Sequence, residues 1–176
     1  MKKAGTQKAR SKQSKAAAQS QPGMTFQSAA RAVPQIAKSV CMGVQALREA
    51  DRKRIHNTKL ATGSIDLDEA LRTAYPNDPR WDYGIGLPGD ARKERVLWLE
   101  VHHAASGETE RVLNKLAALK SWLAAQAPEL QKLPRLFVWQ LSNVESNPND
   151  RRKRNQAAEK HGLVRMSGIL DLARLR

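Results

Sequence analysis

The 176-residue sequence is short of several features, and each shortage excludes a class of protein. Cys41 is the single cysteine, so the chain has neither a disulfide framework nor a zinc site built from cysteines. No apolar run approaches the roughly 18 residues of a membrane span. Lys2 and Lys3 are not followed by an apolar segment, which argues against a secretory signal. We therefore expect a cytoplasmic protein with no membrane partner.

Acidic residues are missing from one end of the chain, which has a net charge of +14. The first 48 residues contain nine Lys and Arg and no Asp or Glu, whereas residues 49–150 are close to neutral. Basic residues again outnumber acidic ones in residues 151–176. Basic ends favour a nucleic-acid partner, DNA or RNA, because counterion release drives such binding; the alternative is that they add only solubility. The predicted contacts are Lys2, Lys3, Lys8, Arg10, Lys12, Lys15, Arg151, Arg152, Lys153 and Arg154.

The composition divides the chain into three parts. Residues 1–23 are of low complexity and contain too little apolar surface to fold, which predicts a disordered basic tail. Residues 24–62 are expected to form a helical N-terminal extension, because Ile36, Val40, Val44 and Leu47 lie at helical spacing. Residues 63–176 are expected to form the core domain.

The core sequence alternates helix and strand patterns. Asp66 can cap a short helix, and an apolar stripe predicts a longer helix over 107–127. Residues 135–143 predict a central strand, because they are rich in β-formers and apolar on both faces. A last helix starts at Pro148, and one or two short strands follow within 163–175. This order predicts an α/β or α+β fold with helices packed on a small mixed sheet.

Two strand-like segments near the middle of the chain each contain a carboxylate. If they form an antiparallel hairpin with Asp82 opposite Glu100, their apolar faces coincide, and Gly84 makes room for the indole of Trp98. Asp82, Glu100 and His102 then share one face. Opposed carboxylates repel, so we expect a divalent cation between them, with one imidazole alongside. The alternative is that this face is solvent-exposed and the acids are ordinary surface residues.

These residues resemble the motif of the PD-(D/E)XK nuclease superfamily, which places an Asp on one strand and an acid-x-Lys on the next. Asp82 matches the first acid, and Glu100-Val101-His102 stands at the acid-x-Lys. The resemblance covers roughly 65–143 and implies a restriction-endonuclease-like core that cleaves phosphodiesters with Mg²⁺ or Mn²⁺. It implies that Asp82 and Glu100 are metal ligands. His102 stands where the motif has a lysine, and we interpret it as a catalytic base or a metal ligand.

Two main hypotheses follow for the function. The first is a metal-dependent nuclease, an endonuclease by the resemblance, acting on nucleic acid. The second is a non-catalytic module that binds nucleic acid or a protein partner and has a degenerate nuclease site. A basic adaptor of unrelated α/β fold is a weaker third. His103 is expected to pack on the apolar face rather than to bind a ligand.

Overall fold

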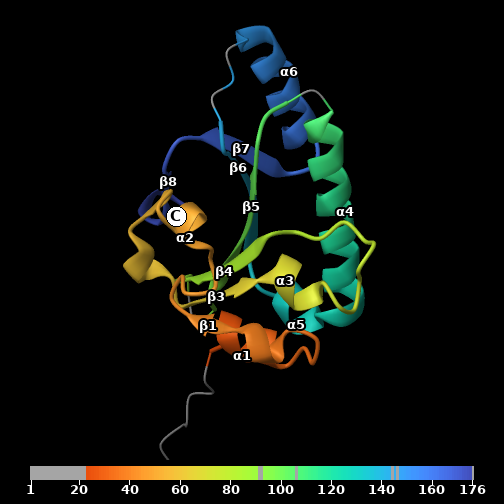
Figure 1. The fold of residues 1–176 in the computed structure, drawn as a ribbon. Coiled ribbons are helices and arrows are strands. Elements are labelled where there is room, and N and C mark those ends of the chain that lie inside the picture. The colour runs from red at the N-terminus through yellow and green to blue at the C-terminus, as the bar shows by residue number, and fades with distance from the viewer. Residues whose placement is uncertain (1–22, 91–92, 106, 144, 146, 176) are drawn as a thin grey trace, which may run out of the picture.

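The computed structural model describes residues 23–90, 93–105, 107–143, 145 and 147–175 (Figure 1). The predicted disordered tail and its six basic residues lie outside this part of the chain, except for Gly23. The helices are α1 (Phe26–Arg31), α2 (Glu49–Arg52), α3 (Leu67–Leu71), α4 (Glu108–Gln126), α5 (Pro128–Gln131) and α6 (Pro148–Glu159), with short 3₁₀ turns at Ala37–Ser39, Thr58–Leu60 and Leu172–Arg174. The strands are β1 (Cys41–Met42), β2 (Ile55–His56), β3 (Gly63–Asp66), β4 (Tyr83–Leu87), β5 (Arg95–His102), β6 (Arg135–Leu141), β7 (Leu163–Ser167) and β8 (Leu170–Asp171).

A six-stranded mixed sheet organises the chain, in the order β1-β3-β4-β5-β6-β7. The strands from β1 to β5 pair antiparallel, whereas β5, β6 and β7 are parallel to one another. Helix α4 connects β5 to β6, and α6 connects β6 to β7, as parallel neighbours require. The predicted α/β class and mixed sheet are confirmed.

Each face of the sheet has its own apolar core. Trp98 and Trp139 face a core that includes Leu116 of α4 and Phe26 of α1. The opposite face packs against the segments around β2 and β8. Figure 1 shows α4 along one side of the sheet and α2 and β8 on the other. β6 is buried on both faces, as its sequence predicts for a central strand.

The β4–β5 hairpin has the register that the sequence predicts. Tyr83 pairs with Leu99, and Gly84 pairs with Trp98. A Cβ atom at Gly84 would lie 2.7 Å from Cζ3 of Trp98, so the indole occupies the space that a side chain would need. This close approach holds Trp98 and Glu100 on the face that α4 covers.

The predicted helix through Ile36 and Leu47 is wrong. This segment forms a 3₁₀ turn, strand β1 and a further turn in which Gly43 has φ +53°. Val40 packs against one core and Val44 against the other, so the apolar residues do not share one helix face. Within 24–62 only α1 and α2 are α-helical, and β1 joins the main sheet beside β3.

Candidate functional site

The hairpin brings Asp82 and Glu100 together at the sheet face under α4. Asp82 directly precedes β4, and Glu100 lies in β5. The Asp82 backbone N–H donates to Glu100 Oε2 at 3.2 Å, and the Val101 N–H donates to Asp82 Oδ2 at 2.9 Å. Each acid is therefore oriented by the strand that carries the other.

A cation lies between the two carboxylates, and it is the ammonium group of Lys115. Its Nζ donates to Glu100 Oε1 at 2.5 Å and to Asp82 Oδ1 at 3.4 Å. We call Asp82, Glu100 and Lys115 the acidic triad. The sequence predicts a divalent ion here and not a lysine. The sequence does contain a signal that this lysine is partly buried. Lys115 falls between Val112 and Leu116, on the apolar stripe through which α4 packs on the core.

The acidic triad is largely removed from water. The Glu100 side chain is fully buried, whereas 19% of Asp82 and 16% of Lys115 are exposed. Burial and then the charge of Asp82 raise the pKa of Glu100 to about 8, although Lys115 opposes both. Burial likewise raises the pKa of Asp82. Burial disfavours the charge on Lys115, but the two carboxylates outweigh it and raise the pKa of this amine. The acidic triad therefore favours the binding of a proton by its carboxylate pair, or the binding of a further cation.

His102 lies on the same face but has a different partner. Its Nε2 contacts Glu108 Oε2 at the start of α4, while its Nδ1 is 4.0 Å from Glu100 Oε1. The hydrogen bond with His102 lowers the pKa of Glu108. The expected packing of His103 is wrong, because β5 ends at His102 and the His103 side chain is 52% exposed, near Glu108.

The basic cluster on α6 divides into an inner and an outer part. Arg151, Arg152 and Lys153 are exposed, so phosphate contact through them stays a prediction. Arg154 instead donates to Glu145 at 2.5 Å, and Arg165 of β7 donates to the same carboxylate at 2.8 Å. Arg154 is therefore already engaged within the fold.

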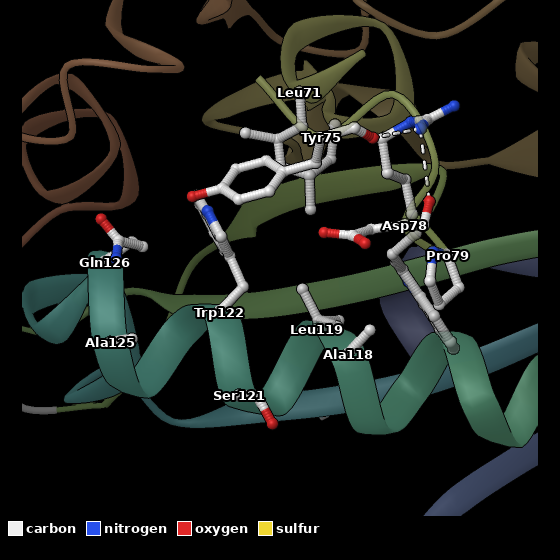
Figure 2. A pocket seen from close by; sticks show the side chains of 13 residues that line it. Leu71, Tyr75, Asp78, Pro79, Ala118, Leu119, Ser121, Trp122, Ala125 and Gln126 are labelled. Atoms are coloured by element: carbon white, nitrogen blue, oxygen red, sulfur yellow. Dashed lines mark hydrogen bonds between the residues drawn. The ribbon is translucent and has the colours of Figure 1, made fainter. Parts of the chain in front are cut away.

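A cavity of about 400 Å³ lies beside the acidic triad, between α4 and the chain that leads from α3 to β4. Two residues that line this cavity are close to the triad in sequence. Trp81 directly precedes Asp82, and Leu119 lies one helical turn after Lys115. Figure 2 shows the Asp78 carboxylate pointing into this cavity, near Leu119. Most of the lining is apolar, and its charged side chains are Asp78 and Arg80, of which Arg80 is already paired with Asp68. The cavity therefore has little positive charge available for a phosphate.

Comparison with protein-family models, with curated proteins and with solved structures finds no match to this chain. In the part of the chain that the structure describes, no helix is long and apolar enough to cross a bilayer. The interpretation of the site therefore depends on its own geometry.

Proposed function

We propose that the chain is a metal-dependent nuclease-like protein whose acidic triad hydrolyses phosphodiester bonds in nucleic acid. One observation carries the proposal: the carboxylate of Asp82 just before β4, the carboxylate of Glu100 in β5 and the ammonium group of Lys115 in the following helix meet at one largely desolvated point. In the motif that the sequence resembles, the lysine lies two residues after the second acid. In this chain Lys115 brings a positive charge to the two acids from α4 instead.

The donor set suits Mg²⁺ or Mn²⁺. Both ions prefer carboxylate oxygens, and the space between Asp82 and Glu100 already accepts a cation, the Lys115 ammonium. Asp82 and Glu100 would hold the ion once Lys115 moves aside. The ion would supply charge stabilisation for the phosphoryl oxygens.

The residues of the chain have separate roles in this proposal. Asp82 and Glu100 concentrate negative charge where burial keeps it poorly solvated, which strengthens their attraction for a cation. Lys115 places a positive charge beside them, where negative charge develops during hydrolysis. His102 is bound to Glu108 and not to either acid, so we assign the positioning of water to Lys115 rather than to His102.

A specific observation favours a second function, a non-catalytic binding module. Each of the four carboxylate oxygens of Asp82 and Glu100 already accepts a hydrogen bond from within the chain. Such a closed arrangement is also what a purely structural ion-pair network would have. In that case the basic residues would bind nucleic acid without cleaving it.

Incubation with nucleic acid separates the two functions. Single- and double-stranded DNA and single-stranded RNA, linear and circular, are incubated with the full chain and Mg²⁺ or Mn²⁺. We expect cleavage by the parent and by His161→Ala, which changes an exposed histidine, and none by Asp82→Asn or Lys115→Met. Cleavage by all four preparations, or by none, would overturn the nuclease proposal. Salt-dependent binding without cleavage would then support the binding module.

A further inference from the structure

A second cluster of ligating groups lies at the junction of β5 and α4. It consists of His102 at the end of β5, His103 after it, and Glu108 at the start of α4. One ligand atom from each residue lies within 4.8 Å of the others. His103 Nε2 is 3.7 Å from Glu108 Oε1, and the two imidazole rings are 4.7 Å apart between centroids.

The three groups are buried to different extents, which leaves the cluster open to solvent on one side. His102 and Glu108 are 18% and 16% exposed, so the surrounding chain fixes their positions, while His103 is half exposed. Solvent therefore reaches the cluster from the His103 side. Arg111 also approaches the cluster: its Nη1 lies 3.9 Å from Glu108 Oε1, and its side chain is mostly exposed. Arg111 can swing away when another cation binds.

We propose that His102, His103 and Glu108 form a binding site for a transition metal of the zinc class, separate from the acidic triad. Two imidazole nitrogens and one carboxylate suit Zn²⁺, Co²⁺ or Fe²⁺, whereas the oxygen-only pair Asp82 and Glu100 suits Mg²⁺ or Mn²⁺. Three protein ligands leave the remaining position of a tetrahedral zinc ion open to water.

The second nitrogen of His102 links the cluster to the acidic triad. A metal ion would bind the Nε2 lone pair of a neutral imidazole, whose single proton is then on Nδ1; any proton held at Nε2 before binding is released to solvent. Nδ1 faces the Glu100 carboxylate 4.0 Å away, an attraction that favours this tautomer although the distance is too long for a hydrogen bond. The proposal does not depend on nuclease activity.

Metal titration of the chelator-treated full chain tests the proposal. Isothermal titration calorimetry should give one Zn²⁺ per chain, and Co²⁺ should give the visible absorption of a low-coordinate site. His103→Ala and Glu108→Gln should each weaken Zn²⁺ binding by at least about tenfold. His161→Ala, which changes an exposed histidine outside the cluster, should leave the affinity unchanged.

Three results would overturn the proposal. They are the absence of any heat or melting-temperature response at millimolar Zn²⁺, an unchanged affinity in both His103→Ala and Glu108→Gln, and equal weakening by His161→Ala. Each would mean that the cluster is a histidine–glutamate ion pair only. The metal-free melting temperatures of all variants are compared with the parent, so that lost binding is not mistaken for unfolding. Cleavage assays of Asp82→Asn test the acidic triad independently.

Discussion

Two buried ionic clusters in this protein have opposite compositions. The acidic triad combines two carboxylates with one lysine under α4. A second cluster, which we call the basic triad, combines Glu145 with Arg154 and Arg165 and joins α6 to β7. Fully ionised, the first has an excess negative charge and the second an excess positive charge.

The pKa values respond to this difference in opposite directions. In the acidic triad, burial and mutual repulsion raise the pKa of Glu100, because one ammonium cannot compensate two carboxylates. In the basic triad, burial opposes ionisation of Glu145, but hydrogen bonds from two guanidinium groups outweigh it and lower the pKa. The Arg165 guanidinium also lies 4.5 Å above the Trp139 ring, which provides further compensation. The carboxylate of the basic triad is fully compensated within the fold, whereas the acidic triad retains an attraction for a proton or a cation.

The largest expected effect is the loss of the carboxylate of the basic triad. Glu145→Gln leaves two arginines close together without a counter-charge, and Arg165 is only 1% exposed. We expect the free energy of unfolding, measured in urea, to fall by about 3 kcal/mol. Glu129→Gln breaks an exposed pair with Lys132 and serves as the control, with an expected loss below about 1 kcal/mol. Equal losses in the two variants would contradict a structural role for the basic triad.

Removal of the single cation of the acidic triad should have a smaller and pH-dependent effect. Lys115→Met leaves Asp82 and Glu100 facing each other, so we expect a loss of about 2 kcal/mol at pH 8, because uptake of a proton relieves part of the repulsion. The loss should shrink at pH 5, and Mn²⁺ should raise the melting temperature of this variant more than that of the parent. A loss that is independent of pH would show that Lys115 contributes packing only.

Removal of a carboxylate from the acidic triad should cost least of the three changes. The native pKa of Glu100, about 8, exceeds that of an unfolded glutamate, so the native protein binds more protons between these values. Its stability is therefore greatest below the unfolded pKa and falls as the pH rises through about 8. Glu100→Gln keeps the shape of the protonated form, so we expect a change below about 1 kcal/mol at pH 7 and a flatter stability profile between pH 5 and 9. A steeper profile in thermal melts would contradict the raised pKa.

The sequence predicts the hairpin half of the acidic triad well, because strand alternation and the Gly84–Trp98 contact are local and set the register. It does not predict the role of Lys115: the position of this lysine on the apolar stripe can be read from the sequence, but its two carboxylate partners are identified only when the helix is docked on the sheet. The segment 34–47 fails for a related reason. Its helical spacing is real, but Val40 and Val44 pack on opposite faces of a sheet whose order is not local information. The basic triad likewise forms only when α6 and β7 pack together, whereas His102, His103 and Glu108 lie close in sequence at the junction of β5 and α4.

The smallest effect on stability is expected on the outer face of α6, next to the basic triad. Arg151 and Arg152 are exposed and line a shallow hollow with Asn155, so their joint replacement by serine should change the free energy of unfolding by less than about 0.5 kcal/mol. If they contact phosphates, the variant should bind DNA or RNA more weakly, with a salt slope reduced by about 1 per lost contact. Binding is measured by fluorescence anisotropy at several salt concentrations. Lys53→Ser with Lys132→Ser removes the same charge from exposed positions just after α2 and just after α5, and provides the control. Equal salt slopes in the two double variants would mean that only net charge matters, and that α6 is not the nucleic-acid contact.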